Sequence, residues 1–491
     1  MGLRELFVAL VALLCLGLGL LLMEQPRTGL AITQLNVAGT PATIMQVAGV
    51  QAPVVVIAHG FAGSRQLMHP IQLTLARAGY ITVSFDFEGH GRNPQPMRGD
   101  VDDIEGTTRL LVDELARVAT AAGALPGADG RLAVVGHSMA SDIIVRFAIE
   151  EPDVDAVVAV SMFSDAVTDA APANLLVING QFEGRLRDAA REIMAELDAV
   201  EGDVVGAPGG DFARRAIVAP GMEHVGVLYS ATTLAETLNW LNESFGRDVS
   251  NGLALIGLPV VLTLLGLVVI AQPIARAWPA GRRVNEVPPG AFWTLSIVPA
   301  ILTPLVLWLV PTTFLPVLVA DYLAVHLAIY GALVLGGLVI EGDAPRVKGW
   351  RAGLGVALFG ILVIGGTLDR YVANFILSGD RWVIFAALLP GAVLAMVADA
   401  TLLQAAQAPA WRRVVARAAF LLSLMIAVAL DPARLFFLVL VLPVMVLYYV
   451  VFGLVGGWVG RRSGSALAMG LGLGVILAWA LAATFPLFDA Q

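Results

Sequence analysis

Nine long apolar segments constrain what this chain can fold into more than any other feature of its sequence. A helix of about 20 apolar residues can cross the hydrocarbon core of a bilayer, because it satisfies its backbone hydrogen bonds internally. The sequence therefore predicts a protein that crosses a membrane nine times. We expect the spans at residues 6–23, 252–271, 292–310, 314–340 (with its core at 322–340), 352–368, 382–400, 414–430, 435–456 and 465–485.

The basic residues between these segments predict the orientation of the chain. Loops on one side carry twelve basic residues: Arg4, Arg276, Arg282, Arg283, Arg346, Lys348, Arg351, Arg412, Arg413, Arg417, Arg461 and Arg462. The alternate loops carry three: Arg370, Arg381 and Arg434. Because basic loops are retained in the cytoplasm, we expect residues 24–250 on the extracytoplasmic side of the cytoplasmic (inner) membrane.

Composition divides the chain into three parts. Residues 24–250 hold 29 acidic and 15 basic residues, whereas the remainder holds 10 and 15. We therefore expect an N-terminal transmembrane anchor (1–23), an extracytoplasmic domain (24–250) and a membrane domain with about eight helices (251–491). The lipid bilayer is an expected partner. Nucleic acid is not, since phosphate binding needs clustered lysine and arginine. Nothing in the sequence specifies an oligomeric state.

Short β-rich runs alternate with amphipathic helical runs along residues 24–250, which predicts an α/β fold. An early pair of strands followed by regular strand–helix alternation indicates a mostly parallel sheet covered by helices on both faces. We expect strands at 31–37, 42–47, 54–58, 81–86, 132–135, 156–161, 175–179 and 214–218. We expect helices at 65–78, 104–122, 139–150, 185–200 and 231–245.

One turn in this domain is typical of a catalytic nucleophile. Gly136-His137-Ser138-Met139-Ala140 follows the apolar run 132–135 and precedes the helix-forming stretch 141–150. A buried strand, a tight turn of small residues centred on serine, and then a helix lift the serine hydroxyl above the strand. Small residues are needed at 136 and 140 because the backbone turns so tightly that larger side chains would collide.

Three further motifs follow strands in the same order as in a known family. His59-Gly60-Phe61-Ala62-Gly63 follows the third expected strand, Asp86-Phe87-Glu88-Gly89-His90-Gly91 the fourth, and Gly221-Met222-Glu223-His224 the last. With the Ser138 turn after the fifth strand, residues 30–246 resemble the α/β-hydrolase superfamily. The resemblance implies a mostly parallel α/β-hydrolase sheet, joined here to an all-α transmembrane helical bundle.

The resemblance also assigns roles to individual residues. Acyl transfer needs a nucleophile, a base and a carboxylate that orients the base, and these roles fall to Ser138, His224 and Glu183. Glu183 stands where aspartate is commoner in the family. The backbone N–H groups of Phe61 and Met139 are expected to form the oxyanion hole. Asp86 and residues 89–91 are expected to shape a loop near the site. The alternatives left open are His69 as base and Asp165, Asp169 or Asp211 as acid.

The site is expected to be open. Only about a dozen residues separate the expected strands 156–161 and 175–179, which leaves no room for the helical cap that many family members insert there. The loops Pro311–Asp321 and Asp369–Arg381, or the membrane helices, are the segments that could still cover it.

Together these features predict a membrane-integral serine hydrolase that cleaves carboxylic esters of a small molecule or lipid through an acyl-enzyme on Ser138. The first alternative is an acyltransferase of the same fold acting on envelope lipids or glycans, in which an alcohol or amine replaces water. The second is a transporter or assembly factor whose hydrolase-like domain only binds. The sequence shows no metal-ligand cluster and no phosphate loop, so no metal or cofactor is expected. One lysine, Lys348, against 29 arginines is typical of GC-rich coding and indicates a bacterial origin.

Overall fold

The computed structural model describes residues 2–100, 104–250, 252–282, 284–310, 312, 314, 315, 317, 319–345 and 348–488. The chain divides into two compact units. One contains residues 18–261 together with the short segment 368–374, and we call it the sheet unit. The other contains residues 1–17, 262–367 and 375–491, and we call it the helical unit.

The sheet unit contains a nine-stranded sheet in the order β1-β2-β4-β3-β5-β6-β7-β9-β8. The strands β3 to β7 and β9 run parallel, whereas β1, β2 and β8 pair antiparallel to their neighbours. This confirms the expected mostly parallel sheet. The bounds are β1 Ala31–Val37, β2 Thr40–Gln46, β3 Ala52–Ala58, β4 Ile81–Phe85, β5 Ala128–His137, β6 Val154–Val160, β7 Asn174–Gly180, β8 Val204–Gly206 and β9 Ala213–Ala219.

The central strands are buried on both faces, which explains why they read as continuous apolar runs. All seven residues of β3 and all seven of β7 are buried. Parallel strands need this double cover, because their crossover connections place helices on both sides of the sheet. The edge hairpin β1–β2 instead turns through Ala38 and Gly39, both with positive φ (52° and 104°), as a two-residue hairpin requires.

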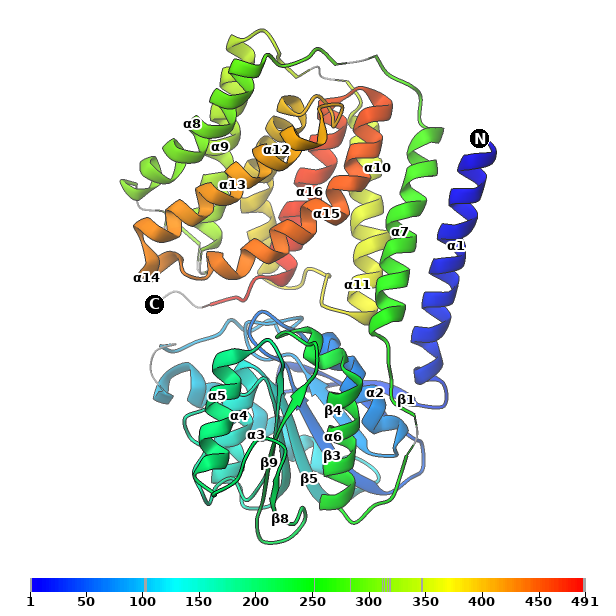
Figure 1. The fold of residues 1–491 in the computed structure, drawn as a ribbon, viewed down its shortest axis with the longest axis vertical. Coiled ribbons are helices and arrows are strands. Elements are labelled where there is room, and N and C mark those ends of the chain that lie inside the picture. The colour runs from blue at the N-terminus through cyan, green and yellow to red at the C-terminus, as the bar shows by residue number, and fades with distance from the viewer. Residues whose placement is uncertain are drawn as a thin grey trace. The chain divides into compact units, whose positions relative to one another are not determined.

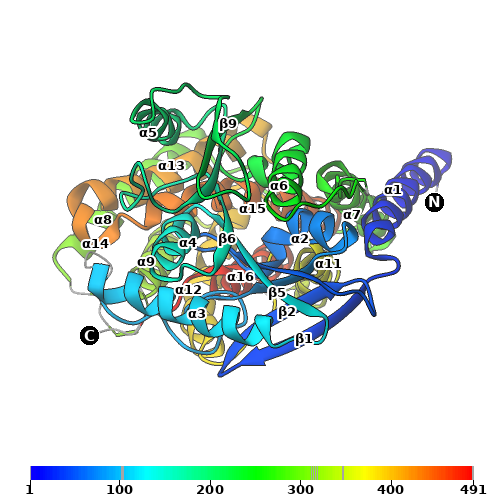
Figure 2. The same cartoon turned by 90° about the horizontal axis from the view of Figure 1, so that it is seen from below.

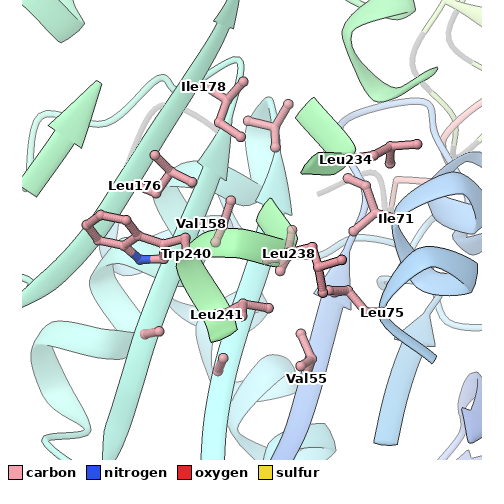
Figure 3. Packing of buried hydrophobic residues seen from close by; sticks show 14 of the residues in the cluster. Val55, Ile71, Leu75, Val158, Leu176, Ile178, Leu234, Leu238, Trp240 and Leu241 are labelled. Atoms are coloured by element: carbon pink, nitrogen blue, oxygen red, sulfur yellow. The ribbon is translucent and has the colours of Figure 1, made fainter. Parts of the chain in front are cut away.

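Helices cover both faces of the sheet (Figure 2). On one face, α2 (His69–Arg77) and α6 (Ala231–Ser244) pack against the strands; α3 (Arg109–Gly123), α4 (Met139–Glu150) and α5 (Gly184–Ala195) lie on the other. Figure 3 shows the core under α2 and α6. Its labelled members are Val55, Val158, Leu176 and Ile178 from the strands, Ile71 and Leu75 from α2, and Leu234, Leu238, Trp240 and Leu241 from α6.

The expected elements of this unit are present, with differences at their ends. All eight expected strands are confirmed, but the short edge strand β8 was not predicted, because three residues are too few to show a periodic pattern. The helix expected at 185–200 ends at Ala195, and Asp198 beyond it has a positive φ of 55°. The helices expected at 65–78 and 104–122 begin with irregular turns, η2 (Arg65–Met68) and η3 (Ile104–Thr108). An unpredicted short turn, η4 (Gly226–Tyr229), precedes α6.

The connection between β6 and β7 has no cap. Residues 161–173 contain neither helix nor strand, as the short spacing predicted. The carboxyl edge of the sheet therefore carries only loops at this point.

The helical unit is an all-α bundle built from long apolar helices (Figure 1). Across the described parts of the chain, nine helical segments are long and apolar enough to cross a membrane, which supports a multi-pass membrane protein. They comprise α1 (Leu3–Glu24), α7 (Gly257–Ala277), α8 (Pro289–Trp308), α9 (Ala320–Ile340), α10 (Trp350–Leu358) with η5 (Phe359–Gly365) and α11 (Gly366–Tyr371), α12 (Arg381–Leu402), α13 (Ala410–Leu430), α15 (Leu438–Ser463) and α16 (Ala466–Thr484).

Helix α16 lies at the centre of the bundle and packs against α10, α12 and α15. Small residues allow the closest approach: a Cβ on Gly470 would lie 2.4 Å from the Cα of Val397, and one on Gly474 would lie 2.5 Å from that of Val393. Close contact of small residues is how helices associate in lipid. The span expected at 314–340 corresponds to α9, which begins at Ala320, and the short helix α14 (Pro432–Leu435) precedes α15.

The packing of α6 on the sheet leads to a stability prediction. Leu241 is fully buried in the core of Figure 3, so Leu241→Ala leaves a cavity and should lower the free energy of unfolding by about 2–5 kcal/mol. Urea unfolding of the detergent-solubilised protein, followed by tryptophan fluorescence, measures the change. Ile149→Ala on α4 is the control, because Ile149 is 41% exposed and should cost well under half as much. Equal losses in both variants would contradict this account of the core.

Candidate active site

The turn between β5 and α4 places Ser138 in a strained conformation. Ser138 has φ 55° and ψ −119°, between the last strand residue, His137, and the first helical residue, Met139. A Cβ on Gly136 would lie 2.6 Å from the carbonyl oxygen of Ala140, so glycine is required there. This is the collision that the sequence predicted. Non-glycine residues keep such a backbone only where the surrounding structure holds them in it, typically at functional sites.

A continuous hydrogen-bonded chain joins Ser138, His224 and Glu183. The Ser138 Oγ lies 2.8 Å from the His224 Nε2, and the His224 Nδ1 lies 2.5 Å from the Glu183 Oε1. His224 follows β9 and is exposed, whereas Glu183 follows β7 and is buried. The three residues predicted from the sequence thus meet at the carboxyl edge of the sheet. This is the geometry in which a histidine takes a proton from a serine while a carboxylate holds its tautomer.

The second oxygen of Glu183 is also fully engaged. Its Oε2 accepts hydrogen bonds from the Ser161 Oγ (2.9 Å) and the Gly180 backbone N–H (2.6 Å). Burial alone would raise the pKa of Glu183, but the hydrogen bonds from His224, Gly180 and Ser161 outweigh it and hold the pKa below its ordinary value of 4.5. Glu183 also precedes the first turn of α5, where the helix dipole favours a negative charge. The carboxylate is therefore ionised at neutral pH.

Ser161 was missed by the sequence analysis. It directly follows β6, has a positive φ of 52°, and donates to the carboxylate from a buried position. The feature that could have identified Ser161 is a polar residue at the end of β6, the strand that pairs with β7. Its role depends on strand order, which the linear sequence does not state.

The alternative residues lie in other environments. His69 begins α2, where its Nδ1 lies 3.3 Å from the Arg27 Nη2, and burial, followed by the charges of Arg27 and Arg65, lowers its pKa to about 3. Asp165 is exposed and forms an ion pair with Arg146. Neither is hydrogen-bonded to Ser138 or His224 in the structure. Asp169 and Asp211 are exposed loop residues with no hydrogen bond to His224.

The loop after β3 packs directly against the Ser138 turn. A Cβ on Gly60 would lie 2.9 Å from the Cβ of Ser138 and 3.0 Å from the carbonyl oxygen of His137, so only glycine allows this approach. Phe61, the next residue, is half-buried beside the turn, and Met139 is the first residue of α4, where the backbone N–H has no partner within its helix. The two residues predicted for the oxyanion hole therefore flank Ser138.

Buried polar contacts hold this loop to the loop after β4. His59 is fully buried; its Nδ1 donates to the Gly60 carbonyl (2.8 Å) and its Nε2 accepts from the Phe87 N–H (3.2 Å). Burial lowers the pKa of His59, so the ring stays neutral and one nitrogen remains an acceptor. Asp86 accepts from the Arg65 backbone (2.8 Å) and guanidinium (3.0 Å), which agrees with the loop-shaping role expected for it.

His137 links the Ser138 turn to the loop that carries His224. The His137 Nε2 donates to the His224 carbonyl oxygen (2.8 Å), and the two rings are 4.9 Å apart. Burial, followed by the proximity of His224, lowers the pKa of His137 to about 4, so it is a neutral donor at physiological pH. In the sequence, this histidine is recognisable only as part of the turn. Within the described ranges, no group of three or more His, Cys, Asp or Glu residues is arranged to hold a metal ion.

Comparisons with known proteins match part of the chain to a hydrolase family. Residues 50–186 match the family described as "Serine aminopeptidase, S33". No curated protein matches the chain. One similar solved structure is a predicted CIB-like hydrolase from Thermoplasma acidophilum, with 16% identity over 43% of this chain and 99% of that chain (TM-score 0.34). Another is an epoxide hydrolase from Vigna radiata, with 21% identity over 27% of this chain and 40% of that chain (TM-score 0.22). A membrane phospholipase A, described as a bacterial virulence factor, shows 14% identity over 50% of this chain and 100% of that chain (TM-score 0.33).

The family match and the strand order identify the sheet unit as an α/β-hydrolase domain. This confirms the resemblance and the fold predicted from the sequence. Part of the chain thus matches a hydrolase family, and the described residues include multiple candidate membrane-spanning helices.

The approach of Gly60 to the Ser138 turn leads to a prediction. Gly60→Ala inserts a methyl group about 3 Å from Ser138, so the loop must move away from the turn. We expect the rate of Ser138 labelling by a fluorophosphonate probe to fall by about 100-fold, as when an oxyanion donor is lost. Gly184→Ala is the matched control, since no atom lies within 4 Å of its added Cβ. Labelling of Gly60→Ala at the wild-type rate would show that the loop tolerates displacement.

The lowered pKa of His137 predicts a pH-dependent stability. The unfolded chain, with an ordinary histidine pKa of 6.5, binds more protons than the folded protein (about 4) between these values, so stability falls as the pH drops from 6.5 to 4. His137→Gln removes this titration, so its melting temperature should fall about 5 °C less than that of the wild type between pH 6.5 and 4.5. Thermal unfolding of both proteins across this range measures the difference. Parallel curves would contradict the assignment.

Proposed function

We propose that the protein is a membrane-integral serine hydrolase that cleaves carboxylic esters through an acyl-enzyme on Ser138. The observation that carries the proposal is the hydrogen-bonded chain from the Ser138 Oγ through His224 to Glu183. Family membership supports hydrolysis in general, and the arrangement of the three side chains supports a covalent route.

Each residue has one role in the proposed reaction. The Ser138 Oγ attacks the acyl carbon while its proton moves to the His224 Nε2, and Glu183 stabilises the imidazolium through Nδ1. The Phe61 and Met139 N–H groups stabilise the oxyanion. His224 then gives the proton to the departing alcohol, which leaves Ser138 acylated. Water attacks this ester with His224 again as the base, and the carboxylic acid and free Ser138 are released.

The surroundings of the site support an apolar acyl group. Phe163, in the loop after β6, is 72% exposed, and Phe182, next to Glu183, is 69% exposed. Both lie on loops at the carboxyl edge, where the connection between β6 and β7 forms no cap. Exposed aromatic side chains near an uncapped site favour esters with hydrocarbon chains. A lipid or envelope ester fits a protein with candidate membrane spans.

The proposed location follows from the arginine distribution. The loops rich in basic residues are proposed to face the cytoplasm, which places the hydrolase domain on the extracytoplasmic side of the inner membrane. Membrane lipid is the proposed partner. Cysteine-accessibility labelling of an introduced Asp165→Cys in intact cells, with Cys15→Ala as background, tests the side: reaction with an impermeant reagent supports it, and reaction only after lysis contradicts it.

Probe labelling tests the proposed nucleophile. A fluorophosphonate should label the purified protein in detergent, and Ser138→Ala and His224→Ala should each lower labelling and ester hydrolysis by at least about 1,000-fold. Products formed in the presence of alcohol or amine acceptors distinguish hydrolysis from acyl transfer. An unlabelled, folded wild type would favour the binding-only alternative.

The role of Glu183 leads to a graded prediction. Glu183→Gln keeps the shape of the side chain but removes the charge that holds the His224 tautomer, so kcat should fall by about 100- to 10,000-fold. Asp165→Asn is the matched control, because Asp165 pairs with Arg146 at the surface and should leave kcat within twofold. Steady-state hydrolysis of a p-nitrophenyl ester measures both. A control as impaired as Glu183→Gln would undermine the assignment.

A further inference from the structure

A short segment that connects two candidate spans belongs to the sheet unit. Residues 368–374 comprise the last four residues of the helical segment Trp350–Tyr371 and the three residues after it. They precede the span Arg381–Leu402, yet they form one compact unit with the hydrolase domain. We call residues 368–374 the strap. The proposed function assigns it no role.

Asn374, at the end of the strap, is buried and uses its backbone and both ends of its side chain. Its backbone N–H donates to the Ser64 Oγ (3.0 Å), and its Nδ2 donates to the Gly91 carbonyl oxygen (3.3 Å). Its Oδ1 accepts from the Arg92 Nε (3.3 Å). Only 2% of Asn374 and 2% of Ser64 are exposed. One residue thus joins the two loops: its backbone binds the loop after β3, and its side chain binds the loop after β4.

These two loops are the ones that hold the predicted oxyanion donor. Ser64 ends the loop that begins at Gly60 and contains Phe61, and Arg65 beside it is bonded to Asp86. Asp86 also accepts from the Arg92 backbone N–H (3.0 Å). The contacts Ser64–Asn374 and Asn374–Arg92 therefore close a ring of hydrogen bonds around the base of the loop.

The rest of the strap is held firmly to the same unit. Asp369 accepts a hydrogen bond from the Arg92 Nη2 (2.5 Å), and Arg370 pairs with Glu24 (2.7 Å). The Tyr371 hydroxyl is also bonded to Glu24, the last residue of α1. With both ends of the strap fixed, Asn374 has little freedom to leave Ser64 and Gly91.

We propose that Asn374 is a positioning residue for the hydrolase site: it holds the loop Gly60–Ser64 so that the Phe61 N–H points at the acyl oxygen. The inference rests on the proposed function. A preorganised N–H donor needs no reorganisation during the reaction, whereas a donor on a mobile loop stabilises the oxyanion less. The hydrogen bonds of Asn374 described above go to Ser64, Gly91 and Arg92, which lie outside the Ser–His–Glu chain.

The kinetic test uses the full chain in detergent and a soluble p-nitrophenyl ester. Asn374→Ala should lower kcat by about 10- to 100-fold with KM within about twofold, because the loop acts on the transition state rather than on ground-state binding. Ser64→Ala removes the hydroxyl that accepts the hydrogen bond from the Asn374 N–H and leaves the residues of the strap unchanged. It should also lower kcat. Thr367→Ala, one residue before the strap, is the matched control, since the Thr367 hydroxyl bonds the Val363 carbonyl of its own helix (2.8 Å) instead of the strap or the site loops, and it should keep kcat within twofold.

A second readout does not depend on catalysis. Hydrogen exchange of residues 60–66 should rise at least tenfold in Asn374→Ala, with the melting temperature close to that of the wild type. Unchanged kcat, or unchanged exchange in this loop, would overturn the proposal. If the wild type shows no Ser138-dependent turnover, the proposed function fails, and the catalytic role of Asn374 fails with it. In that case raised exchange still shows that Asn374 holds the loop, so the two failures are distinguishable.

Discussion

The in-register pairing of parallel strands is the constraint on which the rest of the site depends. Ala58 of β3 pairs with Gly136 of β5, and Gly180 of β7 pairs with Ala219 of β9. Strands aligned in this way end at one edge, so the loops that follow them converge. The buried apolar faces hold the register, because a slip of one residue would turn every inward side chain outward. Residues 41 and 86 positions apart thereby come within hydrogen-bond distance.

Two serines at the same edge have strained backbone conformations, and hydrogen bonds to the neighbouring strands hold them in place. Ser138 and Ser161 both have positive φ, and each directly follows a parallel strand. The Ser138 N–H bonds to the Val160 carbonyl (2.9 Å) and the Ser161 N–H to the Ile178 carbonyl (2.7 Å). The sheet ladder thus continues one bond beyond each strand end and holds the turn in place. A serine hydroxyl is presented above the sheet at each turn, one toward His224 and the other toward Glu183.

Buried polar groups in the hydrolase domain mostly serve to hold loops. The ion pair between Arg65 and Asp86 is almost fully buried, and removal of one partner would leave an uncompensated charge at a cost of several kcal/mol. Such a pair fixes the relation of two loops more firmly than it stabilises the fold. The strap extends this network to a segment more than 270 positions away in the sequence.

Local patterns in the sequence determined the elements and the chemistry. Alternation and apolar runs specified eight strands and the nine candidate spans of the described residues, and the small residues around Ser138 specified the turn. The order of motifs along the chain identified His224 and Glu183 as candidates. The tertiary structure decided which groups support them: Ser161 on the carboxylate, His137 on the His224 carbonyl, and Asn374 on a loop 310 positions away. Periodicity records only which face of an element is buried, whereas these contacts depend on strand order and on backbone groups that carry no sequence signal.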